Sequence, residues 1–168
     1  MSTFSSRLVI LMACSLLTGY VHAQQKAAEL RQLIVGTWVL SEQWVEQDGK
    51  KIQRFGSNPK GLAMYDSGGR FSTILLRNDL PKFASNNAMT GTPEENRAIV
   101  QGTNATFGTW SIDDQDGALV SQIEGSTFPG WDGQRQRRTL SITGEELRMC
   151  VGGAQIGGTA CAIWKRAK

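Results

Sequence analysis

Histidine is nearly absent from this 168-residue chain, which limits the acid–base and metal chemistry that it could do. His22 is the only histidine, and it belongs to a small-residue processing site, Val21-His22-Ala23. Removal of residues 1–23 therefore excludes histidine-based triads, His-Glu-x-x-His zinc sites and imidazole acid–base catalysis. Ser72 is then left without a histidine to activate it as a nucleophile. We expect no metal site and no cofactor.

Two cysteines, Cys150 and Cys161, flank the glycine-rich stretch Gly152–Gly158. A hairpin centred near residues 154–156 places the two cysteines opposite each other on neighbouring strands, within disulfide range. Because an exported protein meets an oxidising compartment, we predict a disulfide that closes this hairpin. Two buried free thiols are the alternative. No Gly-Lys-Ser/Thr follows the glycines, so they do not form a phosphate-binding loop.

Three polar side chains, Tyr65, Glu124 and Arg138, could orient a small molecule if the fold gathers them in one interior. A hairpin centred near residues 130–131 would place Glu124 opposite Arg137 or Arg138, so we expect a Glu–Arg pair. Such a pair either compensates the burial of both charges or marks the polar end of a pocket. Either role requires elements that enclose an interior.

The N-terminal segment is not expected to be part of the folded domain. Residues 1–23 are typical of a secretory signal peptide, with Arg7 before the apolar stretch Leu8–Leu17. This stretch is too short for a membrane span, which needs about 20 residues. The alternative is lipidation at Cys14, since Leu11–Cys14 is similar to a bacterial lipobox. We expect a periplasmic or secreted protein with no membrane span and one domain over residues 24–168.

Strand signals, separated by turns rich in Gly, Asn and Asp, recur along the rest of the chain. A helix-like segment over Gln25–Gln32 precedes them. A second helix is predicted from Thr92 to about Gln101, because Thr92, Pro93 and Glu95 form a capping box with proline at the first helical position. The long loop Asn78–Gly91 precedes it. The predicted strands are Val35–Glu46, Lys51–Phe55, Leu62–Asp66, Arg70–Arg77, Asn104–Asp113, Ala118–Ser126, Gln134–Thr143, Glu146–Val151 and Thr159–Arg166.

This order of strands and tight turns predicts an all-β fold. We expect a single antiparallel up-and-down barrel of eight to nine strands, with one short helix between the fourth and fifth strands. An interior of about eight strands is either filled by side chains or able to hold one small ligand.

A set of motifs occurs in order along the chain: Gly36-Thr37-Trp38, Phe55-Gly56 with Pro59 and Gly61, then Tyr65, Gly69 and Ser72, Leu80-Pro81 with Phe83, Gly91-Thr92-Pro93-Glu94-Glu95, Phe107-Gly108-Thr109-Trp110, Glu124-Gly125-Ser126 and Phe128-Pro129 with Trp131. Together they resemble the motifs of the bacterial and fungal lipocalin-like domain proteins, relatives of the calycin barrels. The resemblance covers about Leu33–Arg166 and implies a barrel with an internal cavity, but not a particular ligand. It also implies that Trp38 plugs the barrel base and that Arg166 stacks on it. No Thr-Asp-x-Tyr signature is present, so kinship to ligand-carrying lipocalins is loose.

Strand alternation predicts which side chains enter the barrel. If Trp38 faces inward, Glu42 and Trp44 point to the same side. Leu140 and Ile142 are predicted to be interior, and Gln136 and Arg138 share their face. The direction of the strand that carries Glu124 stays ambiguous.

Our leading hypothesis is an exported lipocalin-like barrel, a monomer or weak dimer, that binds a small, mostly apolar or amphipathic molecule. The net charge of +3 is too small to suggest a nucleic acid partner. One alternative is an isomerase or cyclase that uses Tyr65 and a carboxylate; another is a filled barrel whose Phe128–Asp132 loop binds a protein. An interior cavity below about 300 Å³ would argue against both small-molecule hypotheses. The candidate ligand-binding residues are Trp44, Tyr65, Phe107, Trp110, Glu124 and Arg138.

Overall fold

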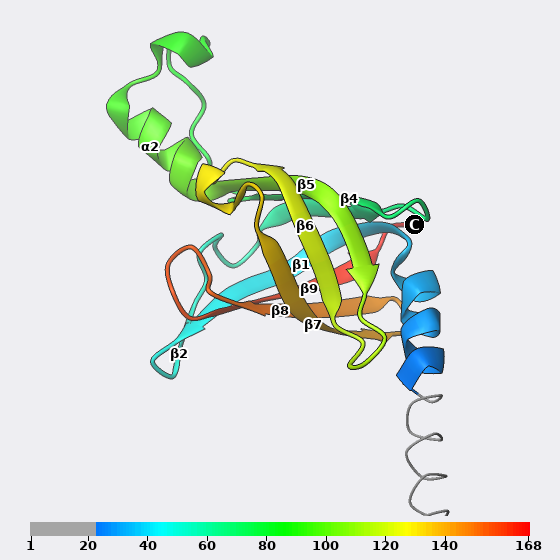
Figure 1. The fold of residues 1–168 in the computed structure, drawn as a ribbon. Coiled ribbons are helices and arrows are strands. Elements are labelled where there is room, and N and C mark those ends of the chain that lie inside the picture. Colours follow the sequence, from blue (N-terminus) through cyan, green and yellow to red (C-terminus); the bar gives the residue numbers. More distant parts are fainter. Residues whose placement is uncertain (1–22) are drawn as a thin grey trace, which may run out of the picture.

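A computed structural model describes residues 23–168 of the chain. Its strands form one antiparallel sheet in the order β2-β1-β3-β4-β5-β6-β7-β8-β9, and pairing of β1 with β9 closes eight of them into a barrel (Figure 1). The predicted all-β barrel is therefore confirmed, with β2 as one extra strand. The strands are β1 (Gly36–Gln47), β2 (Lys50–Ile52), β3 (Lys60–Tyr65), β4 (Arg70–Leu76), β5 (Thr103–Ile112), β6 (Leu119–Ser126), β7 (Arg135–Thr143), β8 (Glu146–Gly152) and β9 (Thr159–Arg166).

The predicted helix between the fourth and fifth strands is α2 (Pro93–Gly102), which lies between β4 and β5. Thr92 accepts a hydrogen bond from the Glu95 N–H, and the Glu95 side chain accepts one from the Thr92 N–H, so the capping box is present. The preceding loop contains the short 3-10 helix η1 (Ala88–Thr90). Together with α2 it projects away from the barrel body (Figure 1).

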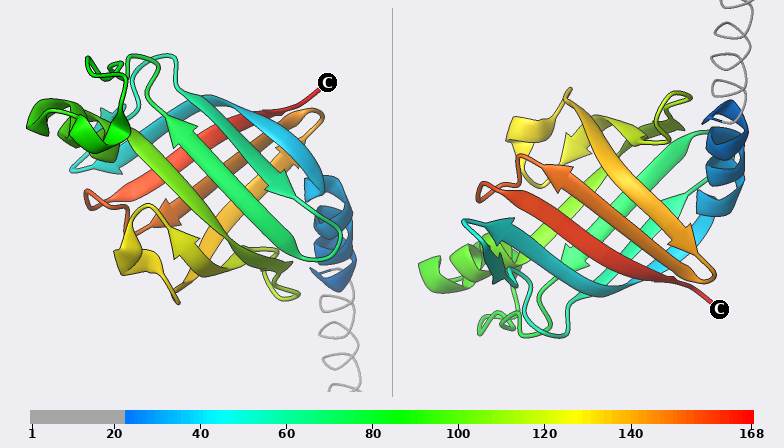
Figure 2. Two further views of the ribbon diagram at one scale, coloured as in Figure 1. Left: turned by 90° about the horizontal axis from the view of Figure 1, so that it is seen from above. Right: turned by 90° about the horizontal axis from the view of Figure 1, so that it is seen from below.

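One end of the barrel is closed by the helix of residues 23–34 (Figure 2). Ala27, Leu30 and Ile34 of this helix are buried against Trp38 and the surrounding core. The Trp38 indole Nε1 donates a hydrogen bond to the Ile34 carbonyl at 2.8 Å. The strand residues of this core include Leu40, Ala63, Tyr65, Phe71, Ile112, Leu119, Leu147, Met149 and Trp164.

Arg166 joins the last strand to this closed end. Its guanidinium carbon lies 4.1 Å from the centre of the Trp38 ring, so the expected stacking of Arg166 on Trp38 is confirmed. The same guanidinium donates hydrogen bonds to the carbonyls of Leu33 and Val35, at 2.5 and 3.1 Å. These carbonyls lie at the C-terminal end of the helix, where a positive charge is favoured by the helix dipole.

A β-bulge in β1 overturns the predicted inward direction of Glu42 and Trp44. The pairing of β1 with β9 shifts register between Leu40 and Glu42. The extra residue reverses the alternation, so that Gln43 and Val45 line the interior. Trp44 instead lies on the outer face, where the Lys51 amine and the Arg148 guanidinium carbon lie 4.8 and 5.7 Å from its ring centres.

The predicted pairing of Glu124 with Arg137 or Arg138 is also wrong. The 3-10 helix η2 (Pro129–Trp131) shapes the connection from β6 to β7, and the resulting register sets Leu119 opposite Arg138. Glu124 faces solvent and accepts two hydrogen bonds from Arg70, at 2.5 and 2.8 Å. These bonds hold the pKa of the Glu124 carboxyl below its usual range.

The predicted disulfide is confirmed. Cys150 and Cys161 are opposite each other on β8 and β9, and their sulfur atoms are bonded at 2.08 Å. Within residues 23–168, no helix is both long and apolar enough to cross a membrane. Cys14 and the predicted signal peptide, apart from Ala23, lie outside the described residues.

Candidate functional site

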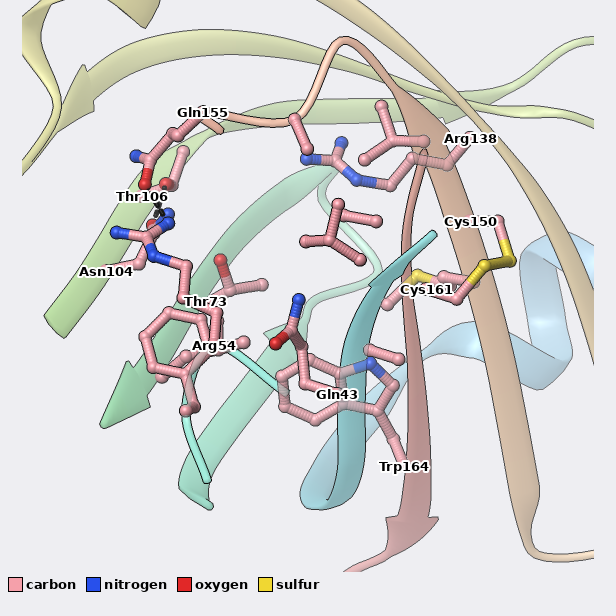
Figure 3. Close-up of a pocket in the computed structure, with 18 of the residues that line it drawn as sticks. Gln43, Arg54, Thr73, Asn104, Thr106, Arg138, Cys150, Gln155, Cys161 and Trp164 are labelled. Carbon is pink, nitrogen blue, oxygen red and sulfur yellow. Dashed lines mark hydrogen bonds between the residues drawn. A yellow bond between two sulfur atoms is a disulfide. The ribbon is translucent and has the colours of Figure 1, made fainter. Parts of the chain in front are cut away.

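The half of the barrel away from the Trp38 end contains a cavity of about 110 Å³ (Figure 3). It opens at the end where the β8–β9 loop and the segment before β3 meet, and Ile156 at this opening is 41% exposed. The volume is below the roughly 300 Å³ at which pockets for drug-sized ligands begin. By the limit stated above, this volume argues against both small-molecule hypotheses for a ligand of that size. It leaves only a smaller molecule, or one that extends through the opening.

The walls of the cavity are largely apolar. Tyr65 and Phe71 stack with their ring centres 6.1 Å apart and form part of the surface toward the closed end. Trp164 on β9 adds an indole ring (Figure 3). The aliphatic and thioether part of the lining comes from Val45, Leu75, Met149, Val151, Ala160 and Ala162.

Arg138 brings a positive charge into this apolar interior. Side-chain alternation along β7 places Arg138 on the inward face, together with Leu140 and Ile142, as predicted. Leu140 and Ile142 pack against the core. Its guanidinium donates hydrogen bonds to the Ser121 hydroxyl at 3.1 Å and to the Gln136 side-chain oxygen at 2.6 Å. Burial lowers the pKa of Arg138 from its usual value, because desolvation disfavours the charged form.

The Tyr65 hydroxyl is a second donor in the interior. It lies 3.6 Å from the Met149 sulfur, and a thioether is a weak acceptor. Burial raises the pKa of Tyr65 to about 12, with the charge of Arg138 acting in the opposite direction. The hydroxyl therefore stays protonated near neutral pH and can donate to a bound acceptor.

Arg54 places a second guanidinium at the opening (Figure 3). It donates to the Gln155 side-chain oxygen and, at 3.4 Å, to the Gln101 carbonyl. Its guanidinium carbon lies 4.9 Å from the centre of the Phe55 ring. Burial lowers the pKa of Arg54 as well. Through Gln155, this arginine links the segment after β2 to the β8–β9 loop.

Two buried polar atoms of the cavity lining have no hydrogen-bond partner. They are the Gln43 side-chain oxygen and the Trp164 indole nitrogen. Buried polar groups are normally paired, because an unpaired one costs about 1–3 kcal/mol. Both atoms are enclosed by protein, so each is an uncompensated polar group in the wall of the cavity.

The structure brings together only two of the six candidate ligand-binding residues. Tyr65 and Arg138 line the cavity, while Glu124 faces solvent and Trp44 lies on the outer face. Phe107 is 50% exposed. Trp110 packs edge-on against Tyr65 at 5.7 Å between ring centres, but its own pocket is a separate one beside the helix of residues 23–34.

The absence of Glu124 from the interior bears on the isomerase or cyclase hypothesis. No Asp or Glu is among the described residues that line the cavity. A carboxylate partner for Tyr65 is therefore not assembled there.

The polar and aromatic cavity residues that the sequence analysis does not predict include Gln43, Arg54, Gln155 and Trp164. Trp164 could have been found, because it precedes Arg166 by two residues and strand alternation gives both the same face. Gln43 is inward only because of the bulge. Arg54 and Gln155 are separated by 101 residues, and no local pattern indicates that they meet.

A closed antiparallel barrel that is packed at one end and hollow at the other defines a binding-barrel kind of protein. Residues 35–167 match the lipocalin-like domain family, and the chain belongs to this family. No curated protein matches the chain significantly.

Proposed function

We propose that this protein binds a small molecule, largely apolar or amphipathic, in the open half of its barrel. The observation that carries the proposal is the cavity itself, whose apolar walls bear a few polar groups, among them Arg138 and Tyr65. Such a combination is typical of ligand sites, where apolar area supplies affinity and polar groups fix orientation.

The volume of about 110 Å³ limits what this ligand can be. A ligand enclosed in full must be smaller than a drug-sized molecule. A longer ligand must be slender, with one end in the cavity and the rest passing the opening near Trp131 and Ile156. The proposal therefore favours a short or chain-like molecule over a bulky ring system.

A series of straight-chain alcohols, from butanol to decanol, tests this proposal by calorimetry. Each methylene group that enters the cavity adds about 0.8 kcal/mol, or roughly fourfold in affinity. We expect this increment for short chains and a smaller one once the chain extends beyond the opening. Native mass spectrometry of protein purified from its own host would show whether a natural ligand stays bound.

A pair of variants provides the control. Ala160→Phe fills the cavity, because Ala160 lines it, and should abolish alcohol binding. Thr159→Phe adds the same ring to an exposed neighbour on β9 and should leave binding unchanged. Equal binding by both variants, or no binding of any alcohol to the unaltered protein, would refute a ligand site in the cavity.

We further propose that the protein is exported, to the periplasm or the medium, and that it works as a monomer or weak dimer. The Cys150–Cys161 disulfide supports an oxidising compartment. The mass of the protein from its host would report cleavage after Ala23, and a lipid-modified Cys14 would contradict it. Light scattering measures the oligomeric state.

A further inference from the structure

We infer that the cavity binds the carboxylate group of a small organic acid, and that Arg138 is the residue that binds it. This inference rests on the proposed function, because it names the chemical class of the ligand at the same site. It starts from a charge inside the barrel that the protein itself does not neutralise.

Arg138 differs from the ion-paired arginines on the protein surface. Its two hydrogen-bond acceptors, Ser121 and Gln136, are neutral. A guanidinium has five N–H donors, so most of the Arg138 donors are not used by these two bonds. The surface pairs are Arg31–Asp114, Arg70–Glu124, Arg77–Asp79 and Arg137 with Asp113 and Asp116.

The surroundings of Arg138 increase the excess of positive charge in the barrel interior. Arg54 adds a second positive charge at the opening, and no Asp or Glu is among the described residues of the lining. Enclosing a charge without an opposite charge is strongly unfavourable, and neutral hydrogen bonds offset only part of that cost. An anion that enters the cavity from outside would neutralise this buried positive charge.

The shape and the donors of the site favour a carboxylate. A guanidinium presents parallel N–H groups that match the two oxygens of a carboxylate. The Tyr65 hydroxyl, which has only a thioether as acceptor, is a further donor on the lining. The apolar walls suit the hydrocarbon part of the same molecule.

Calorimetry with octanoate and octanol tests the inference on the unaltered protein. The two ligands have the same carbon chain, so their difference reports the head group. A charge-assisted hydrogen bond should make octanoate about ten- to a hundredfold tighter than octanol. Equal affinities, or tighter binding of octanol, would overturn the inference while leaving the proposed function intact.

Substitutions at two neighbouring residues test whether Arg138 causes the preference for octanoate. Arg138→Gln should remove the preference for octanoate but retain octanol binding. Arg137→Gln removes an equal charge from the adjacent outward position and should keep the preference. Survival of the preference in Arg138→Gln would overturn the assignment to Arg138. Competition by inorganic phosphate at the same concentration as octanoate would overturn the assignment to a carboxylate.

If neither octanoate nor octanol binds, the proposed function fails together with the inference. If Arg138→Gln does not fold, the comparison of the two ligands on the unaltered protein still decides whether a carboxylate is preferred. Arg138→Lys is then used in place of Arg138→Gln. This variant keeps the positive charge but loses the paired N–H donors, so it should reduce the preference for octanoate.

Discussion

The two ends of this barrel are built on different principles. At the closed end, the helix of residues 23–34 packs on Trp38, and Arg166 links the ring to the helix carbonyls. At the open end, Arg54 and Arg138 face a cavity that no carboxylate of the described lining neutralises. We expect stability to be concentrated where the interior is filled, and we propose that a ligand binds where it is not.

Strand β7 shows this division within a single element. Leu140 and Ile142 pack against the core, whereas Arg138, two residues before Leu140 on the same face, reaches the cavity. Arg137 points outward and pairs with Asp113 and Asp116, at 2.7 and 2.8 Å. Adjacent arginines thus differ in their surroundings: Arg137 forms surface ion pairs, and Arg138 is a buried charge beside the cavity.

The largest effect is expected from Trp38→Ala. Trp38 is 0% exposed and carries a hydrogen bond to Ile34, so the variant should lose about 3–5 kcal/mol of unfolding free energy. Urea denaturation measures the loss. Trp131→Ala at the open end is the matched control and should cost less than half as much, because Trp131 is partly exposed. Equal losses would contradict the difference between the two ends.

The next effect concerns the disulfide at the open end. Cys150 and Cys161 are separated by 11 positions. On chain-entropy grounds, loss of the crosslink should lower the unfolding free energy by on the order of 3 kcal/mol. Urea denaturation of the double variant Cys150→Ser/Cys161→Ser and of the oxidised protein measures this difference in unfolding free energy. A stability unchanged by the double substitution would show that the hairpin holds without the bond.

Tyr65 lies between the two ends of the barrel. Its ionisation should make the unfolding free energy depend on pH in the alkaline range. Its pKa is raised from 10.0 to about 12, so the folded state favours the protonated phenol. Stability is then full below pH 10 and decreases as the pH rises toward 12, by roughly 2–3 kcal/mol. Tyr65→Phe should abolish this decrease.

Ultraviolet absorbance of the phenolate provides an independent check. Tyr20 and Tyr65 are the only tyrosines, so a chain that begins at residue 24 reports Tyr65 alone. Ionisation with a midpoint near pH 10 in the folded protein would mean that the hydroxyl is not enclosed.

The smallest effect on stability is expected from Arg138→Met. Because Arg138 has no opposite charge, its replacement by an apolar side chain should leave the unfolding free energy unchanged or raise it slightly. Arg137→Met, which breaks two exposed ion pairs, should cost about 0–1 kcal/mol. A loss of several kcal/mol in Arg138→Met would show that the buried arginine supports the fold.

Features set by local sequence could be predicted far better than those that depend on how distant strands meet. Turn residues such as Asp48 and Gly49, both with positive φ, mark strand limits locally, and the stacking of Arg166 on Trp38 follows from the motif that carries Trp38. The disulfide followed from the spacing of its cysteines around a glycine-rich turn.

The lining of the cavity depends on features that no local pattern contains. The bulge after Leu40 turns Gln43 inward and Trp44 outward. The η2 turn sets a register that keeps Glu124 away from Arg138, and Glu124 finds Arg70 instead, 54 residues away in sequence. Strand alternation is reliable within one regular strand, and it fails where a bulge or an irregular turn adds a residue.

The indole signals of an ¹⁵N-labelled sample, titrated with octanoate, test the central claim most directly. The chain has five tryptophans, and they are spread over both ends and the outer face. Trp131 and Trp164 line the cavity, so their indole signals should shift as octanoate binds, and the Trp38 signal at the closed end should not. Shifts at Trp38 or at the outward Trp44 without shifts at Trp131 and Trp164 would contradict ligand binding in the open half of the barrel.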